Sequence, residues 1–159
     1  MTRTEISLFL KNAPGELGKL ALLLSQESIN IDAMTIQDAS SYVFELFKAR
    51  GKSINRIASS ASYNSVRKDS AQFALIRLLV DQTDKAMNIL SKNEYLFDIT
   101  PVIAIYLDNA PGSLADITSK FGKEGININY VYGSASNINE KCLFVFCPEN
   151  MELATKIFG

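Results

Sequence analysis

The sequence predicts an α+β protein built from two copies of one βαββαβ unit. The first observation is an internal repeat: NAPGELGKLALLLSQESINID (12–32) aligns without gaps on NAPGSLADITSKFGKEGININ (109–129). The second is hydrophobic periodicity, since in both copies an alternating apolar segment precedes a segment with apolar residues three and four apart, which indicates strand then helix. With 159 residues and 47% hydrophobic composition, the chain is long enough to bury a core.

Each copy is expected to open with a strand, Glu5–Lys11 (EISLFLK) and Val102–Asp108 (VIAIYLD), because aliphatic residues alternate at matching positions. A helix then follows NAPG, whose proline suits a helix start because its missing N–H would have no partner there. The apolar stripe of this helix comprises Leu17, Leu20, Ala21 and Leu24 in the first copy, and Leu114, Ile117 and Phe121 in the second. Gly125 is expected to end the second helix, and Ser28 stands at the equivalent place in the first.

The remaining elements also recur. A second strand is expected at INIDAMTI and at ININYVYG, and then ALIRLLVDQTDKAMNILSKN and CLFVFCPENMELATKIFG both suggest a strand, a turn and an amphipathic helix. EYLFDITP (94–101) supplies a fourth strand to the first copy, whereas the second copy has none after its helix. The predicted domains are therefore residues 1–100, with an inserted segment at about 41–70, and a second, truncated unit at 101–159.

A βαββαβ unit is expected to form a ferredoxin-like layer of antiparallel strands with its helices on one face, so the predicted fold is two such units in tandem. This fold hosts many functions, so the motif must carry the functional prediction. NAPGxL after the first strand, with SINI or GINI opening the second, resembles the ACT domain family of small-molecule regulatory modules, and more narrowly the small standalone proteins made of two ACT units. The resemblance implies that an amino acid or a similar small ligand binds where the loop after strand one meets strand two of a paired ACT unit.

The chemistry of the motif agrees with that implication. The Pro-Gly turn presents backbone N–H groups at a helix start, where an α-carboxylate is favoured, and Gly15 and Gly112 leave room for a ligand. Candidate acceptors for an α-ammonium group are Asn12, Asn30 and Asp32 in one copy, and Asn109, Asn127 and Asn129 in the other. Only Asp32 is charged, so we expect its site to hold an ammonium more tightly.

The predicted ligand-binding residues are Asn12, Ala13, Pro14, Gly15, Glu16, Leu17, Asn30, Ile31 and Asp32, and Asn109, Ala110, Pro111, Gly112, Ser113, Leu114, Asn127, Ile128 and Asn129. The alternative is that the asparagines are ordinary turn and cap residues and that the Ile-Asn-Ile runs alternate core aliphatics with solvated amides. A branched-chain or aromatic amino acid is favoured by the apolar residues around these positions, namely Leu17, Ile31, Met34, Leu114 and Ile128. No cofactor is expected.

Two features depart from a plain tandem repeat. The inserted stretch begins with a strand-like run, Tyr42–Ala49, and then turns serine-rich and basic, which favours either a solvated loop with an extra hairpin or a basic docking surface or lid. Without a fourth strand, the second unit would leave the edge of Val102–Leu107 unpaired, a liability that proteins normally cover. The expected covers are strand four of the first unit running past Pro101, the inserted strand, or a second chain, and a homodimer is preferred over a monomer.

Composition excludes several classes of function. The chain has no histidine, which removes Ser-His, Cys-His and HExxH mechanisms, and its formal charge of −1 does not favour nucleic acid. No apolar run reaches the roughly 20 residues that a membrane span needs, and the N-terminus lacks the pattern of a signal peptide, so a cytoplasmic location is expected. Cys142 and Cys147 would face opposite sides of a strand, which predicts two reduced thiols and no metal site.

The expected function is therefore an amino-acid-binding regulator without catalysis, acting on an unidentified enzyme or regulator partner. One alternative is a protein-interaction module without a ligand. An acylphosphatase-like enzyme would need an arginine-containing phosphate loop where NAPG stands. An RNA-binding sheet could use Tyr130 and Tyr132, or Phe144 and Phe146, as stacking pairs, but no K/R-G-F/Y pattern accompanies them.

Overall fold

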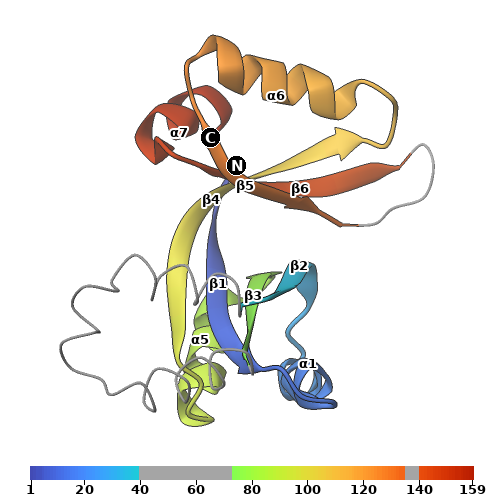
Figure 1. Ribbon diagram of the computed structural model, residues 1–159, viewed down its shortest axis with the longest axis vertical. Helices are drawn as coiled ribbons and strands as arrows, with labels where there is room; N and C mark the ends of the chain where they lie inside the picture. Colours follow the sequence, from blue (N-terminus) through green and yellow to red (C-terminus); the bar gives the residue numbers. More distant parts are fainter. Residues whose placement is uncertain (40–72, 135–139) are drawn as a thin grey trace, which may run out of the picture.

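The computed structural model describes residues 1–39, 73–134 and 140–159. The elements of the first unit, labelled as in Figure 1, are β1 (Thr2–Lys11), α1 (Glu16–Gln26), β2 (Ile31–Asp38), β3 (Phe73–Val80), α5 (Thr83–Lys92) and β4 (Phe97–Asp108). After β4, the second unit continues with α6 (Ser113–Lys123), β5 (Ile128–Gly133), β6 (Lys141–Pro148) and α7 (Met151–Phe158). This order confirms the predicted α+β fold of two βαββαβ-like units. The expected inserted segment, with its strand Tyr42–Ala49, lies outside the described residues.

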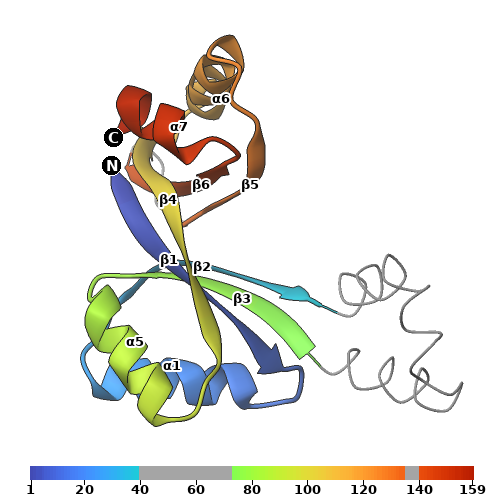
Figure 2. The ribbon, with the colours of Figure 1, turned by 90° about the vertical axis from the view of Figure 1, so that its left-hand side faces the viewer.

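The six strands of the described residues form one antiparallel sheet in the order β2-β3-β1-β4-β6-β5. Strand β4 belongs to both units: Phe97–Ile103 pairs with β1, and Ile103–Asp108 pairs with β6, so the predicted boundary after residue 100 falls inside one continuous strand. The sheet bends sharply along the paired strands β1 and β4, and α1 and α5 cover the outer face of one half while α6 and α7 cover the outer face of the other (Figures 1 and 2). The uncovered faces of the two halves are turned toward each other.

The start of β1 completes the second unit. Thr2 and Arg3 pair with Ile103 and Val102, and the N–H of Ala104 donates to the Met1 carbonyl at 2.9 Å. The N-terminal ammonium donates to the carbonyls of Ala104 at 3.3 Å and Phe158 at 3.0 Å. Strand β4 runs past Pro101, as one expectation stated. Its edge, however, pairs with the first residues of the chain, and these residues were not among the expected covers.

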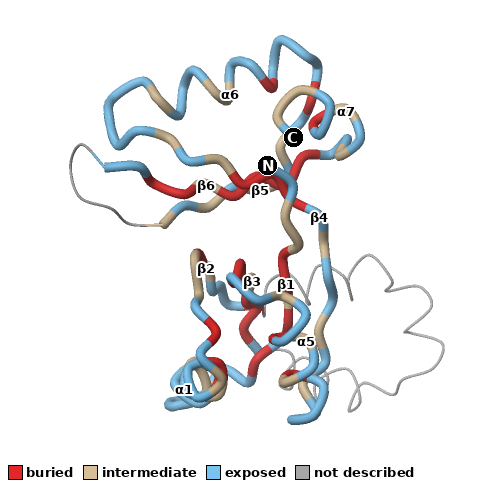
Figure 3. Tube along the Cα trace, turned by 180° about the vertical axis from the view of Figure 1, so that it is seen from behind, coloured by how far each residue is buried: buried red, intermediate tan, exposed pale blue. Residues whose placement is uncertain are grey.

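In the part of the chain that the structure describes, the core lies in three clusters, two of them beneath the helices. Under α1 and α5, Leu20 and Leu24 are buried against β1 and β3, and under α6 the ring of Phe121 stacks on Phe158 with centroids 4.1 Å apart. Of the apolar stripes predicted for these helices, Leu20, Leu24 and Phe121 are buried, Leu17 and Ile117 are partly buried, and Leu114 is exposed. The buried residues concentrate in β1, β3 and β6, as the tube in Figure 3 shows.

The third cluster joins the two open sheet faces. Ala33 and Leu79 of the first unit pack against Leu143, Val145 and Cys147 of the second. Both cysteines of β6 are buried, and they do not form a disulfide with each other, as the strand periodicity predicted. Within the described ranges of the chain, no helix is long and apolar enough to cross a membrane.

Candidate functional site

The two NAPG loops have the same backbone structure. In the first loop Ala13 N–H donates to Lys11, Glu16 to Ala13 and Lys19 to Gly15, at 2.9, 3.3 and 2.9 Å. The second loop repeats this set at the matching positions, with bonds of 2.8, 3.3 and 2.9 Å made by Ala110, Ser113 and Asp116 to the carbonyls of Asp108, Ala110 and Gly112. The repeat seen in the sequence is therefore also a repeat of hydrogen bonds.

Glycine is required in both loops by backbone conformation. Gly15 and Gly112 have φ values of 88° and 96°, in the left-handed region that residues with a Cβ adopt only at a cost. Each glycine precedes a helix, and the first intrahelical bonds accept at Gly15 and Gly112, so the N–H groups of the first turn point out of the helix end. Space is open around both positions where a Cβ would stand, so each loop presents an accessible helix N-terminus.

Residues at the starts of the second strands already form hydrogen bonds with other residues of the same chain. The carboxylate of Asp32 accepts Arg3 Nη2 at 2.7 Å and Asn30 Nδ2 at 2.8 Å, and the Asn30 N–H donates to Asp81 at 2.9 Å. In the second copy the Asn127 carbonyl accepts the N–H of Glu149 at 2.9 Å. The negative charge that distinguished the first site is therefore paired with Arg3, and an ammonium group would have to compete with that guanidinium.

The loops and the strand starts lie at opposite ends of each unit. Next to the first loop, Lys11 pairs with Phe73, whereas Ile31 at the start of β2 pairs with Val80 at the other end of β3. An eight-residue strand separates these levels by roughly 23 Å. The second unit has the same arrangement, and the β1–α1 and β4–α6 connections lie at the two ends of the long axis of the molecule (Figure 1).

Most of the apolar residues named with these sites contribute to the core. Leu17, Ile31 and Met34 pack against the cluster under α1, and Ile128 packs against the cluster under α6. Leu114, beside the second loop, is 41% exposed. Most of these aliphatic residues are therefore core residues, as the alternative interpretation of the sequence stated. Leu114 is the one among them that remains available to a ligand.

A buried carboxylate between the two units is the feature that sequence reasoning missed. Glu5 of β1 is 0% exposed, and its two oxygens accept the hydroxyls of Tyr130 at 2.6 Å and Tyr132 at 2.8 Å. Arg77 Nε lies 3.8 Å from the same carboxylate, and its guanidinium carbon is 4.0 Å from the centre of the Tyr130 ring. Three polar groups thus compensate one buried charge, as burial of a charge requires.

These contacts also alter the tyrosines. Burial raises the pKa of both Tyr130 and Tyr132 far above its ordinary value, and the negative charge of Glu5 raises it further. Neither aromatic pair considered for RNA stacking lies on an open face, because these tyrosines bind Glu5 and Phe146 is buried beside Phe121. The sequence feature that could have indicated this cluster is a charged residue inside an apolar run, namely Arg77 in ALIRLLV.

Comparisons with known proteins agree on the fold. A family model described as an ACT domain pair matches residues 43–158. Protein BT0572 from Bacteroides thetaiotaomicron has a similar structure, with 27% identity, a TM-score of 0.68 and coverage of 99% of this chain and 89% of that one. No match was found among curated proteins.

Two similar structures carry a regulatory or enzyme-subunit description. The ligand-free regulatory subunit of aspartate kinase from Thermus thermophilus is 11% identical, with a TM-score of 0.54 and coverage of 92% of this chain and 85% of that one. A structure of aspartokinase alpha and beta subunits is 14% identical, with a TM-score of 0.55 and coverage of 99% and 92%. At these identities the likeness concerns the fold.

Proposed function

The chain belongs to the family of ACT domain pairs, and from this membership we propose that it is a regulatory protein that binds a free amino acid and has no catalytic activity of its own. The binding sites would be built on the two NAPG loops. A similar fold in the regulatory subunit of an aspartate kinase supports the regulatory part of this proposal.

The observation that carries the proposal is the duplicated loop. Both copies hold a left-handed glycine at the start of a helix, with the same three hydrogen bonds and open space around the glycine. The helix dipole and the first-turn N–H groups that point out of the helix end favour an anion at such a position, and an α-carboxylate is an anion of suitable size. Leu114 beside the second loop would contact an apolar ligand side chain, which favours a branched-chain or aromatic amino acid.

The proposal also requires a second copy of the chain. The family resemblance pairs each loop with the start of a second strand, and within each unit these two halves are separated by the length of a strand. The two loops also lie at opposite ends of the molecule (Figure 1), so we propose that a site that unites a loop with a strand start forms between two chains of a homodimer. Ligand binding at the dimer interface would then be passed on to a partner enzyme or regulator as a change in shape or assembly, with a typical coupling of about 1–3 kcal/mol.

Charge substitution in the loops tests the location of the sites. Gly15→Asp and Gly112→Asp each place a carboxylate beside the expected position of the ligand carboxylate, and each is expected to weaken amino-acid binding at its own loop by tenfold or more in isothermal titration calorimetry. The matched control is Gly125→Asp, because Gly125 also has a positive φ, 67°, and open space around it, but it stands at the far end of α6. It therefore reproduces the backbone strain without reaching the loop.

The three variants separate the possible outcomes. A binding stoichiometry that is unchanged in Gly125→Asp and reduced in each of the two loop variants supports the loop sites. Equal affinity and stoichiometry in all three would contradict them. Size-exclusion chromatography with light scattering, with and without the amino acid, tests the dimer independently of affinity.

A further inference from the structure

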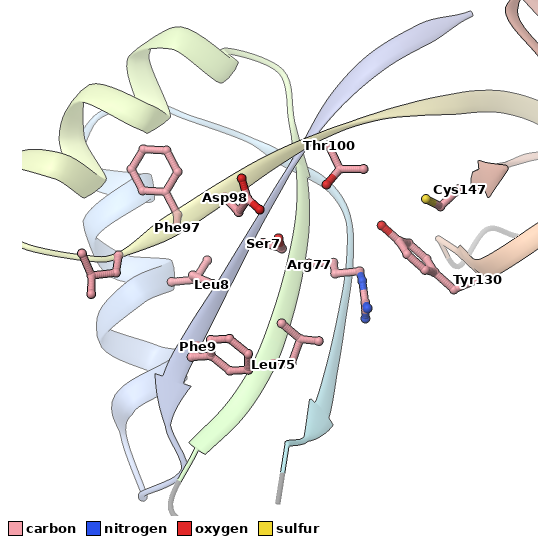
Figure 4. Close-up of a pocket in the computed structure, with 11 residues that line it drawn as sticks. Ser7, Leu8, Phe9, Leu75, Arg77, Phe97, Asp98, Thr100, Tyr130 and Cys147 are labelled. Carbon is pink, nitrogen blue, oxygen red and sulfur yellow. The ribbon is translucent and has the colours of Figure 1, made fainter. Parts of the chain in front are cut away.

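A cavity of about 450 Å³ lies between the open sheet face of the first unit and the second unit. Its floor is formed by side chains of β1, β3 and the start of β4, and Tyr130 and Cys147 of the second unit face it (Figure 4). Small-molecule sites commonly have volumes of about 300–1,000 Å³. The cavity is therefore of suitable size for a small ligand that would contact both units.

The floor of the cavity carries a cationic side chain on one side of β1 and an anionic side chain on the other. Ser7 of β1 pairs with Arg77 of β3 on one side and with Asp98 of β4 on the other, so the three side chains form one row across the sheet. In Figure 4 Ser7 lies between the other two. Neighbouring strands are about 4.8 Å apart, which places the two charged residues about 10 Å apart at their backbones.

Both charged groups have capacity left for a ligand. The Arg77 guanidinium turns Nε toward Glu5 at 3.8 Å and donates from Nη1 to Gln37 at 3.5 Å, and among the described residues this leaves Nη2 for a further acceptor. Asp98 is exposed, and its Oδ1 accepts the N–H of Ile99 at 2.9 Å. Within the part of the chain that the structure describes, no lysine or arginine forms an ion pair with Asp98.

The rest of the cavity is apolar. Phe9 and Leu75 line it one step further along β1 and β3, and they pair with each other across the two strands. Phe9 is 49% exposed and Leu96 at the rim is 90% exposed, so apolar surface here remains in contact with water. An apolar ligand side chain placed over Phe9 and Leu75 would remove that surface from water.

We propose that this inter-unit cavity is a second ligand site, which binds an α-amino acid with an apolar side chain. Arg77 binds the α-carboxylate, Asp98 binds the α-ammonium group, and Phe9 and Leu75 contact the side chain. Arginine presents planar paired donors that match a carboxylate, and aspartate is an acceptor for an ammonium group. The ligand class follows from residues of one chain, so the proposal is independent of the NAPG loops and of dimer formation.

The test uses L-leucine and L-phenylalanine, with their N-acetyl forms, in isothermal titration calorimetry on the intact chain. N-acetylation removes the ammonium charge, so it should weaken binding to the wild type by tenfold or more. Asp98→Asn should weaken binding of the free amino acid to a similar extent while leaving affinity for the N-acetyl form unchanged. Arg77→Lys, which keeps the charge beside Glu5, should weaken both forms. Asp84→Asn, an exposed aspartate on α5, is the matched control and should behave as the wild type.

The outcomes distinguish this site from the loop sites. Unchanged affinity in Asp98→Asn together with loss in Gly15→Asp and Gly112→Asp would overturn the cavity site and leave the proposed function intact. Absence of binding by the wild-type chain for all twenty amino acids would overturn both. Loss in Asp98→Asn of the binding event that persists in Gly15→Asp and Gly112→Asp, with an unfolding temperature equal to that of the Asp84→Asn control, supports the cavity.

Discussion

Just after the first helix of each repeat, equivalent backbone positions hold different residues, Ser28 in the first repeat and Gly125 in the second. Ser28 and Gly125 both adopt a left-handed conformation, with φ of 55° and 67°, and both are followed by an isoleucine N–H that donates back into the helix, to Leu24 at 3.0 Å and to Phe121 at 2.9 Å. The motif is the same, but a residue with a Cβ carries a cost of about 1–2 kcal/mol in this conformation. Ser28 therefore has a strained backbone conformation, and the second repeat avoids this strain by having glycine at the equivalent position.

A reciprocal exchange measures this strain. Ser28→Gly is expected to raise the free energy of unfolding by about 1 kcal/mol, and Gly125→Ser to lower it by about 1 kcal/mol. Urea denaturation of the two variants and the wild type gives both values under one set of conditions. A loss of stability in Ser28→Gly would show that the serine side chain makes a stabilising contact that outweighs its backbone conformation.

The tyrosines on Glu5 predict a loss of stability in alkali. Their pKa is raised in the folded state, so above about pH 10 the unfolded chain has released phenolic protons that the folded chain still holds. The unfolded state then binds fewer protons, and stability must fall as the pH rises beyond that point, whereas below about pH 10 the contribution is fully present. Thermal unfolding measured from pH 8 to pH 11.5 is expected to show this decline.

Substitution identifies the groups responsible. Tyr132→Phe should make the alkaline decline shallower, because it removes one of the two raised groups. Tyr106→Phe is the matched control, since Tyr106 is 56% exposed and its replacement removes no bond to Glu5. An identical decline in the two variants would contradict the assignment of the effect to the Glu5 cluster.

At the scale of elements, the sheet of the second unit depends on the beginning of the chain. Removal of residues 1–3 deletes the strand pairing with Val102 and Ile103, the hydrogen bond from Ala104 and the ion pair with Asp32. We expect a loss of about 2–4 kcal/mol in the free energy of unfolding, since each hydrogen bond contributes about 0.5–1.5 kcal/mol. Hydrogen exchange should show faster exchange at the Ala104 amide in this variant.

Thr2→Ala serves as the control for the truncation, because it preserves the backbone pairing. It should change stability by less than about 0.5 kcal/mol and leave the Ala104 amide protected. Equal protection of that amide in the truncated chain would mean that another segment covers the edge of β4.

Elements that depend on local pattern were predictable, and those that depend on distant pairing were not. The helix after each NAPG follows from apolar spacing within about a dozen residues, and both helices formed where expected. The cover over Val102 and Ile103 comes from residues about one hundred positions away, which no local periodicity encodes. For the same reason the N-terminus was absent from the three covers that the sequence suggested, which were strand four of the first unit, the inserted strand and a second chain.

At the scale of the whole molecule, the sharp bend in the sheet decides which residues meet. It turns the open faces of the two units toward each other and thereby joins Glu5 and Arg77 of the first unit with Tyr130 of the second. It also leaves the NAPG loops at the two ends of the molecule (Figure 1). Sequence reasoning identified the loops because they repeat, but the relative placement of the two units is a property of tertiary packing, so the cavity could not be predicted.

Binding of an amino acid to the whole protein is the central claim, and a thermal-shift measurement against each of the twenty amino acids at millimolar concentration tests it most directly. A ligand at 100 times its Kd adds about 2.7 kcal/mol, which corresponds to a rise of roughly 5–10 °C in Tm for a chain of this size. We predict a selective rise of this order with one or a few branched-chain or aromatic amino acids. An unchanged Tm with all twenty would contradict the account.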